Sequence, residues 1–400
     1  KIGIIKEGKV PSDKRVPLTP FQCQQVLSTY SDVQIKCQPS DIRCFPDEEY
    51  RNAGVEVVED ISDCEIILGV KEVPIPMLME GKTHFFFSHT MKKQEYNRDL
   101  LQAVVNKNVS LIDWECLTNK DGQRLIAFGR YAGIVGAYNA IWTYGQRYRL
   151  FDIRRAHECF DLDDMKTEYK KVSLPPIKIV LTGGGRVSKG AMEVFLGMGI
   201  RKVSPAEFLS EYFDRPVFAQ LNTRDYNVKT NGTSFNRDEF YKDPSVYVSG
   251  FASFAEKADI LVAGAYWDPK APVLFTKEEA LETNFKIRVI GDITCDIEGS
   301  IPSTKKPSTI DDPIYDYDPS TDKIEGAFSD EGNITVMAVD NLPCELPRNA
   351  SEDFGKEFVS HILPNLVGED KDEIIKRATI TKEGRLTAEY SYLQDFVDGH

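Results

Sequence analysis

A lysine, a histidine and glutamates follow three apolar runs in the first third of the chain. The run EIILGV leads into Lys71 and Glu72, THFFFS leads into His89, and VSLIDW leads into Glu115. Lysine and histidine can exchange protons near neutral pH when their surroundings tune them, and nearby glutamates do such tuning. The pattern predicts an acid/base pair of Lys71 and His89, with Glu72 and Glu115 beside it. A hydrogen-bonded core histidine, a solvated strand end and a capping glutamate remain open for the residues taken singly.

Three cations extend this set. Lys9 and Arg15 follow the first apolar run, and Arg124 follows Glu115. A guanidinium can hold a carboxylate with two parallel hydrogen bonds, so Arg15 is a candidate clamp for a substrate carboxylate, and Lys9 and Arg124 could act likewise. Each alone could equally be an ordinary surface residue. Several such clamps together would suit a dicarboxylate or amino-acid substrate.

The elements that must position these residues alternate between strand and helix, which predicts an α/β fold with a parallel, doubly wound sheet. Helical spacing occurs at Thr19–Thr29, Asp47–Ala53 and Lys93–Asn106. Ligands bind beyond the carboxyl ends of the strands in such sheets, so the three strand ends should meet at one edge. The expected strands are Ile2–Ile5, Val33–Cys37, Val55–Val58, Glu65–Val70, Thr83–Phe87 and Val109–Asp113.

A second α/β unit begins at Ile177, where the run IKIVLT ends in a glycine-rich turn. An apolar strand, a glycine turn and a helix in this order are typical of dinucleotide binding, because glycines let the backbone approach the pyrophosphate at the helix N-terminus. The first two glycines fall on Gly183 and Gly185, with Gly184 between them, and the third position is Ser188. The following helix is expected over Ala191–Gly197. A tight structural turn is the alternative.

The choice between NAD and NADP depends on the end of the next strand, about 20 residues further on, where NAD-binding chains carry an acid. We expect that end at Val203 or Ser204, where no acid stands. The cations Arg186, Arg201 and Lys202 could attract a 2′-phosphate, or could simply lie on the surface. The pattern therefore favours NADP, and NAD remains open.

The helical pattern from Tyr131 to Arg149 is rich in small residues and could carry the chain from one domain to the other. We expect a substrate domain from residues 1–135 plus 345–400, and a dinucleotide-binding domain from 136–344. The second domain should hold a partly irregular insertion at about 205–250, and the polar segment Ser300–Asp322 should be a loop.

The composition excludes several classes of function. The 49 basic and 63 acidic residues give a net charge of -14, which disfavours nucleic acid and anionic lipid. The apolar runs are too short for membrane spans, and the N-terminus reads as a strand rather than a signal peptide. The 8 scattered cysteines and the lack of metal-ligand spacing predict reduced thiols in the cytoplasm and no metal site.

Long segments of the chain resemble the saccharopine dehydrogenase group, which is similar in fold to alanine dehydrogenase and the transhydrogenase α subunit. The nearest resemblance is to the lysine–2-oxoglutarate reductase part of the aminoadipic semialdehyde synthases. The fungal lysine-forming enzymes, which lack the insertion, are more distant. The resemblance implies two Rossmann-like domains separated by a cleft, with substrate on the first and cofactor on the second. The matching segments are KEGKVPSDKRVPLTP, ILGVKEVP, FFFSHTMKKQ, LIDWECLTNKDGQRLIAFGRYAG, TGGGRVSKGA, DITCDIEGSI and AVDNLPCELPRNASE.

The resemblance also implies roles for particular residues. The catalytic lysine and histidine of the group fall on Lys71 and His89. The group's substrate contacts fall on Arg15, Gln94, Arg124 and Asp296, and we expect Lys9 and Phe128 to contact the substrate as well. Its cofactor contacts fall on Gly185, Arg186, Val339, Asp340, Asn341 and Leu342. The glycine turn and the strand ends add Gly183, Gly184, Val187, Ser188, Ser204 and Asp292 to the expected cofactor site.

The expected activity is an NAD(P)H-dependent reductive condensation of L-lysine with 2-oxoglutarate to saccharopine, or its reverse. The reductase branch uses NADPH, in line with the missing acid. No second, saccharopine-oxidising unit follows in this sequence, so we expect one half of a pathway. Another amino-acid dehydrogenase, such as an alanine dehydrogenase, and a non-catalytic dinucleotide-binding regulator are the alternatives. A homo-oligomer is compatible with the sequence, which fixes neither the physiological direction nor the partner enzyme.

Overall fold

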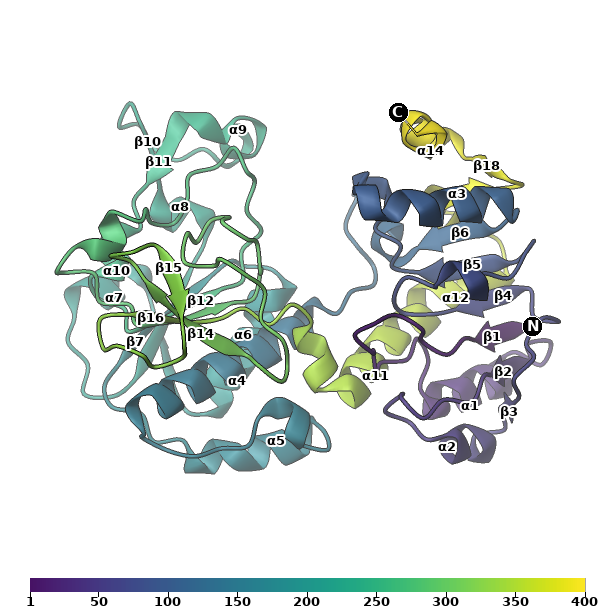
Figure 1. The fold of residues 1–400 in the computed structure, drawn as a ribbon, viewed down its shortest axis with the longest axis horizontal. Coiled ribbons are helices and arrows are strands. Elements are labelled where there is room, and N and C mark those ends of the chain that lie inside the picture. The colour runs from purple at the N-terminus through teal and green to yellow at the C-terminus, as the bar shows by residue number, and fades with distance from the viewer. Residues whose placement is uncertain (400) are drawn as a thin grey trace. The chain divides into compact units, whose positions relative to one another are not determined.

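The computed structural model describes residues 1–399, which divide into two compact units (Figure 1). Of the described residues, 1–128 and 347–399 form the first unit, and 129–346 form the second. The first boundary therefore lies before the long helix α4 (Gly129–Tyr148), whereas position 135 would have cut through it. The reason is packing: a Cβ at Gly133 would lie 1.8 Å from the carbonyl oxygen of Val187, so α4 lies against the second unit from its first turn.

The first unit contains an eight-stranded sheet in the order β18-β17-β6-β5-β4-β1-β2-β3. The strands from β6 to β3 are parallel, as expected, while β17 and β18 are antiparallel additions from the C-terminal segment. The strands are β1 (Ile2–Ile4), β2 (Ile35–Cys37), β3 (Glu56–Val57), β4 (Ile66–Leu68), β5 (Thr83–Phe86), β6 (Ser110–Asp113), β17 (Thr379–Lys382) and β18 (Arg385–Leu386).

The helices of the first unit cover both faces of its sheet because strand residues alternate between two cores. In β5, Phe85 belongs to one buried cluster with Phe354 and Phe358, and Phe86 belongs to the other with Leu101. The helices are α1 (Pro20–Thr29), α2 (Asp47–Asn52), α3 (Arg98–Asn106), α11 (Pro347–Glu357), α12 (Leu363–Val367), α13 (Ile374–Ala378) and α14 (Gln394–Asp398). Short 3-10 turns are η1 (Ile75–Met77), η2 (Thr90–Lys92), η3 (Glu95–Asn97), η4 (Trp114–Cys116) and η11 (Ala388–Leu393), and η10 (Phe358–Ile362) is a π-helix.

The second unit contains another eight-stranded sheet, in the order β15-β14-β16-β13-β12-β7-β9-β8. The six strands from β16 to β8 are parallel, and β14 and β15 run antiparallel at one edge. The strands are β7 (Lys178–Thr182), β8 (Arg201–Val203), β9 (Val217–Leu221), β12 (Ile260–Ala263), β13 (Val289–Asp292), β14 (Ile314–Asp318), β15 (Lys323–Glu325) and β16 (Ile334–Met337).

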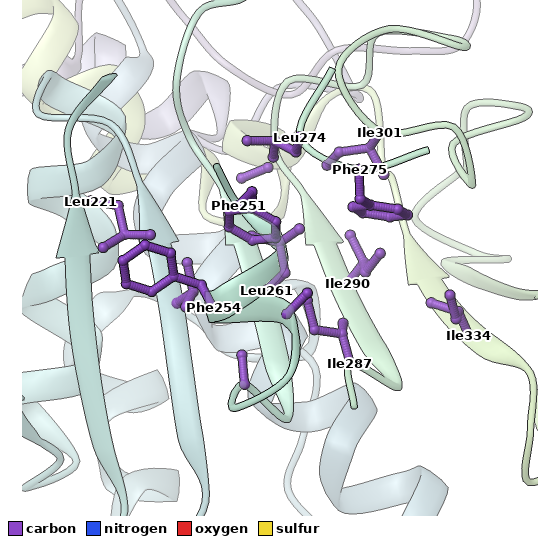
Figure 2. Close-up of a cluster of buried hydrophobic side chains, with 14 of the residues drawn as sticks. Leu221, Phe251, Phe254, Leu261, Leu274, Phe275, Ile287, Ile290, Ile301 and Ile334 are labelled. Atoms are coloured by element: carbon purple, nitrogen blue, oxygen red, sulfur yellow. The ribbon is translucent and has the colours of Figure 1, made fainter. Parts of the chain in front are cut away.

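Helices α4 and α6 pack side by side against one face of the second sheet, and an aromatic core lies against the other. Close approach of the two helices depends on Gly133 and Gly190, where a Cβ would clash with the partner backbone. Figure 2 shows the opposite face, where side chains of β9, β12 and β13 gather with phenylalanines. The helices are α4, α5 (Leu162–Glu168), α6 (Arg186–Gly197), α7 (Pro205–Ser210), α8 (Thr223–Tyr226), α9 (Arg237–Lys242) and α10 (Ala252–Ala255), with 3-10 turns η5 (Ala156–Glu158), η6 (Tyr169–Lys171), η7 (Pro244–Val246), η8 (Glu279–Leu281) and η9 (Leu342–Glu345).

Three expectations for the second unit need correction. Residues 205–221 form α7 and the sheet strand β9, so the insertion is confined to residues 222–250, with the two-stranded sheet β10 (Asn227–Lys229) and β11 (Tyr247–Ser249). The expected loop at 300–322 contains β14, which pairs with β16. Helix α6 begins at Arg186, directly after the glycine turn, because Gly185 serves as its N-cap. Within residues 1–399, no helix is long and apolar enough to cross a membrane.

Candidate active site

Four adjacent parallel strands of the first unit end beside one another. Strands β6, β5, β4 and β1 are neighbours in that order, so the residues after their carboxyl ends share one edge of the sheet. Lys9 follows β1, Lys71 and Glu72 follow β4, His89 follows β5, and Glu115 follows β6. This edge is where a doubly wound sheet binds its ligands.

Glu72 connects two of these strand ends. Its Oε1 lies 2.7 Å from His89 Nδ1, and its Oε2 accepts a hydrogen bond from Lys9 Nζ. Burial by itself would raise the pKa of the Glu72 carboxyl, but the hydrogen bonds from His89 and Lys9 outweigh it and lower that pKa to about 2. Glu72 is therefore ionised at neutral pH and fixes the orientation of the imidazole. The other ring nitrogen, Nε2, is then the one available for proton exchange.

The backbone around His89 is held in an unusual conformation. His89 has a φ of 54°, in the left-handed region that few residues other than glycine adopt. Just before it, the backbone N–H of Ser88 donates to the buried carboxylate of Asp113 at 2.8 Å, and Asp113 also accepts from the N–H of Glu115 at 2.7 Å. Asp113 thus ties the ends of β5 and β6 together. Strain held by such bonds is typical of functional sites.

Glu7 positions the start of the segment that carries Lys71. Its two carboxylate oxygens accept from the backbone N–H groups of Val70, at 2.7 Å, and of Lys71, at 3.0 Å. Desolvation of the carboxylate raises the pKa of Glu7 to about 7, with the charge of Asp13 acting in the same direction. Neither Glu7 nor Asp113 was among the residues expected at this site. A charged residue at the end of an apolar run is the signal that could have found both.

Glu115 lies in a neighbouring cluster of charges. Its carboxylate pairs with Arg124 at 2.8 Å and with Lys92 at 3.1 Å. Arg124 and Glu115 therefore form an ion pair at this edge of the sheet. Gln94 is exposed, and its side chain accepts a hydrogen bond from Tyr96.

Arg15 and Phe128 form a third group. Arg15 is buried and holds Asp13 through two side-chain hydrogen bonds of 3.0 and 2.6 Å. Its guanidinium stacks 4.1 Å above the Phe128 ring, whose centroid lies 4.4 Å from that of Phe354. The Phe87 ring contacts both Phe128 and His89, with centroids 6.1 and 6.3 Å away. Aromatic rings thus link the Arg15 group to the histidine.

The glycine turn of the second unit has the geometry of a phosphate site. Gly183 has a φ of 100°, and a Cβ there would lie 2.7 Å from Ser188 Oγ. Gly184, Gly185 and Arg186 are exposed at the N-terminus of the 12-residue helix α6, where backbone N–H groups and the helix dipole attract phosphates. Nothing lies within 4 Å of a Cβ built on Gly185. This turn fits a dinucleotide pyrophosphate.

The remaining expected cofactor residues separate into buried and accessible ones. Ser188 is buried and its hydroxyl donates to the carbonyl of Thr182 at 2.9 Å, so it closes the turn from inside. Asp292 is 1% exposed, and its carboxylate accepts from Thr294, Cys295 and Thr304. Its role is to shape the loop after β13. In the segment after β16, Val339 and Leu342 are buried, Asn341 is half-buried and Asp340 is exposed. Elsewhere in the unit, Val187 is half-buried and Asp296 is exposed.

The position chosen for cofactor selection needs correction. Ser204 follows β8, but β8 is the edge strand and does not neighbour β7. The strand beside β7 is β9, which ends at Leu221 and is followed by Asn222. A Cβ on Gly184 would lie 2.8 Å from Asn222 Oδ1, so Asn222 adjoins the glycine turn. Sequence order could not reveal that the later strand lies between β7 and β8. Asn222 is neutral, and Arg224 follows two residues later.

Among residues 1–399, no group of three or more histidine, cysteine, aspartate or glutamate side chains has the geometry to hold a metal ion.

Comparison with known proteins gives concordant matches. Residues 3–135 match the family model described as alanine dehydrogenase/PNT, N-terminal domain. The chain is 30% identical over 438 residues to the alpha-aminoadipic semialdehyde synthase of Arabidopsis thaliana, covering 98% of this chain and 41% of that protein. It is 24% identical over 381 residues to the saccharopine dehydrogenase (NAD(+), L-lysine-forming) of Emericella nidulans, covering 91% of each.

Solved structures share the fold. An L-alanine dehydrogenase aligns with a TM-score of 0.66 at 16% identity, over 99% of each chain. The chain spans less than half the length of the semialdehyde synthase it matches. The two mostly parallel sheets with helices on both faces are thus the Rossmann-like pair of domains seen in the alanine dehydrogenase structure.

Proposed function

We propose that this chain, which belongs to the saccharopine dehydrogenase and alanine dehydrogenase–transhydrogenase family, reductively condenses L-lysine with 2-oxoglutarate to saccharopine, or runs the reverse reaction. The observation that carries the proposal is the Lys9–Glu72–His89 chain of hydrogen bonds beside Lys71. Amine addition to a ketone and loss of water need protons moved on and off the nitrogen and oxygen bonded to one carbon, and reduction of the imine adds hydride to that carbon. A site for this chemistry needs two groups that exchange protons and an acid that keeps one of them oriented.

His89 and Lys71 share the proton transfers. The substrate amine must lose its proton before it attacks the ketone, and the hydroxyl of the carbinolamine must gain one before it leaves as water. Glu72 holds His89 by Nδ1, so Nε2 takes or gives the proton, and the Glu72 carboxylate stabilises the imidazolium that forms.

The substrates carry carboxylates, and the first unit offers guanidinium groups for them. Arg15 lies between Asp13 and the Phe128 ring, and Arg124 lies beside Glu115. A guanidinium has five N–H donors in a fork, so it can hold an acid of the protein and a substrate carboxylate together. In the proposal Arg15 and Arg124 orient the reactants. Orientation of this kind contributes much of the rate in bimolecular reactions.

The second unit binds the cofactor in this proposal. Gly183, Gly184, Gly185 and Arg186 hold the pyrophosphate, and Asp340 and Asn341 are further candidate contacts. When bound, the reduced cofactor supplies the hydride to the imine carbon. Neutral Asn222 at the end of β9 does not repel a 2′-phosphate, and Arg224 can attract one, so we favour NADPH over NADH.

The test is an assay of cofactor oxidation with the purified full chain. Lysine plus 2-oxoglutarate should drive oxidation of NADPH faster than of NADH, and saccharopine should appear in equal amount. Pyruvate plus ammonia in place of lysine and 2-oxoglutarate probes an alanine dehydrogenase-type activity. Turnover with pyruvate and ammonia alone, or NADPH binding without turnover of any of these substrates, would overturn the proposal.

A further inference from the structure

A fully buried carboxylate adjoins the turn that carries His89. Asp113 is the last residue of β6, and its Oδ2 accepts both from the backbone N–H of Ser88, at 2.8 Å, and from the Ser88 hydroxyl, at 2.5 Å. Its Oδ1 accepts from the N–H of Glu115 at 2.7 Å. Burial raises the pKa of the Asp113 carboxyl, and the hydrogen bonds from Ser88 and Glu115 oppose that rise. A carboxylate holds such donors more firmly than a neutral side chain does.

The Ser88 hydroxyl extends this link across His89. Its one proton is donated to Asp113, so its oxygen accepts from Thr90, from the backbone N–H at 3.3 Å and from the hydroxyl at 2.8 Å. Ser88 and Thr90 are both fully buried, and they flank His89 in the chain. His89 has a φ of 54°, in the left-handed region. The chain of hydrogen bonds therefore closes around the strained residue and holds it in this conformation.

Two different acids thus act on one histidine. Asp113 holds its backbone through Ser88, and Glu72 holds its ring, with Oε1 2.7 Å from Nδ1. The direction of a side chain depends on the backbone conformation that carries it. A change of His89 from the left-handed to an extended conformation would therefore swing the imidazole away from Glu72.

Asp113 also fixes a second part of the site through Glu115. The N–H of Glu115 is bonded to Asp113, and the Glu115 carboxylate pairs with Arg124 at 2.8 Å. Arg124 is a proposed clamp for a substrate carboxylate. One buried carboxylate therefore sets the spacing between a group that moves protons and a group that orients the reactants. Such spacing matters, because a misplacement of about 1 Å can cost about a hundredfold in rate.

We propose that Asp113 is a positioning residue, which acts through Ser88 to keep His89 in its left-handed conformation. Through Glu115 it also fixes the distance from His89 to Arg124. In this proposal Asp113 touches neither substrate nor cofactor. Its effect on turnover rests on the proposed function, whereas its hold on the histidine ring does not.

The experiment compares two buried hydroxyls of the first unit in the full chain. Ser88→Ala removes the hydroxyl link and keeps the backbone bond to Asp113. The matched control is Thr381→Val, which removes an equally buried hydroxyl that accepts from the N–H of Leu111 and donates to the carbonyl of Val109. With lysine and 2-oxoglutarate, kcat should fall by about tenfold to a hundredfold in Ser88→Ala and by less than about twofold in Thr381→Val. The dissociation constant for NADPH should be unchanged in both.

A double-mutant cycle separates positioning from a purely structural role. In the His89→Ala background the positioned group is gone, so Ser88→Ala should cause no further loss of rate in single-turnover kinetics. If Ser88→Ala lowers the rate by the same factor in both backgrounds, the hydroxyl supports only the fold and the proposal is overturned. Asp113→Asn should lower kcat at least as much as Ser88→Ala, because it removes one of the two acceptor oxygens.

The ring of His89 reports the same link without turnover. The chain has 5 histidines, so the Cε1–H nuclear magnetic resonance signal of His89 can be identified by its absence in His89→Ala. Ser88→Ala should shift this signal in the same direction as Glu72→Ala does, because both changes release Nδ1, and Thr381→Val should leave it in place. A signal that does not move in Ser88→Ala would overturn the proposal.

The two readings distinguish failure of the positioning role from failure of the proposed function. If the wild type does not turn over lysine with 2-oxoglutarate but the ring signal shifts in Ser88→Ala as in Glu72→Ala, the proposed function fails and the positioning role stands. If the wild type and Ser88→Ala turn over these substrates equally fast, only the positioning role fails.

Discussion

The Glu7 carboxylate accepts a hydrogen bond of 3.0 Å from the backbone N–H of Lys71, and one of 2.7 Å from the N–H of Val70. An acid after β1 therefore fixes the backbone after β4, and with it the lysine proposed to move protons. One carboxylate accepts hydrogen bonds from both N–H groups. Protonation or replacement of Glu7 should therefore directly affect the backbone position of Lys71.

Glu7→Gln should change how stability depends on pH. The folded pKa of Glu7 is raised from 4.5 to about 7, so its stabilising contribution is complete below 4.5 and is lost as pH rises through about 7. Glutamine does not titrate. The unfolding free energy of the wild type minus that of Glu7→Gln should therefore fall between these pH values, by on the order of 2 kcal/mol after allowance for partial exposure. Denaturant unfolding at several pH values measures it, and parallel pH profiles for the two proteins would contradict the prediction.

His89→Ala should reduce turnover while leaving cofactor binding intact. Removal of a group that moves a proton in the transition state typically costs about 10² to 10⁴ in rate. The glycine turn belongs to the other unit, so the dissociation constant for NADPH should be unchanged. His361→Ala, at a half-exposed histidine with a surface ion pair, is the control and should keep full turnover. Steady-state kinetics and NADPH fluorescence titration supply both values; a His89→Ala enzyme with wild-type kcat would remove the histidine from the mechanism.

Asn222→Asp should shift the cofactor preference toward NADH. An acid at the end of β9 repels a 2′-phosphate and can accept from a ribose hydroxyl. Asparagine caps α8, and aspartate is an equally good cap, so the fold should persist. Ser204→Asp is a matched control, because Ser204 is the N-cap residue of α7, as Asn222 is of α8, but it follows the edge strand β8. The ratio of kcat/KM for NADPH over NADH should fall by about tenfold or more in Asn222→Asp alone. A fall in Ser204→Asp instead would reverse the assignment.

These positions show what the sequence could and could not reveal. All six strands expected in the first unit occur, because apolar runs and helical spacing report burial on a sheet with two covered faces. The same apolar runs also predicted that Lys71, His89 and Glu115 follow neighbouring strand ends. The ends of apolar runs also mark Glu7 and Asp113, but their role could not be predicted, because their partners are backbone N–H groups of other strands, which no side-chain pattern displays.

The second unit shows a different limit of sequence reasoning. Strand β9 is a short apolar run inside a polar, aromatic segment, and it enters the sheet between β7 and β8. The order of the strands along the chain therefore differs from their order in the sheet, at the position expected to select between NAD and NADP. The prediction at Ser204 assumed that the next strand along the chain, β8, neighbours β7, whereas the neighbour of β7 is β9. The pairing of β7 with β9 is a long-range property that local patterns do not encode.

Two glycine variants should separate folding from cofactor binding at the phosphate turn. Gly183 has a φ of 100° and no room for a Cβ, which would lie 2.7 Å from Ser188 Oγ and 3.0 Å from the carbonyl oxygen of Gly264. Gly183→Ala should therefore lower the unfolding free energy, by about 1–3 kcal/mol.

Gly185→Ala should instead leave stability nearly unchanged, because nothing lies within 4 Å of its Cβ and its φ is negative. The new methyl group would occupy space that the pyrophosphate needs, so NADPH affinity should fall by about tenfold or more. Gly326→Ala, another position with open space around the Cβ and no left-handed φ, controls for the substitution itself. Chemical denaturation and NADPH titration on the three variants measure both quantities. Wild-type affinity in Gly185→Ala would mean that the pyrophosphate does not lie on this turn.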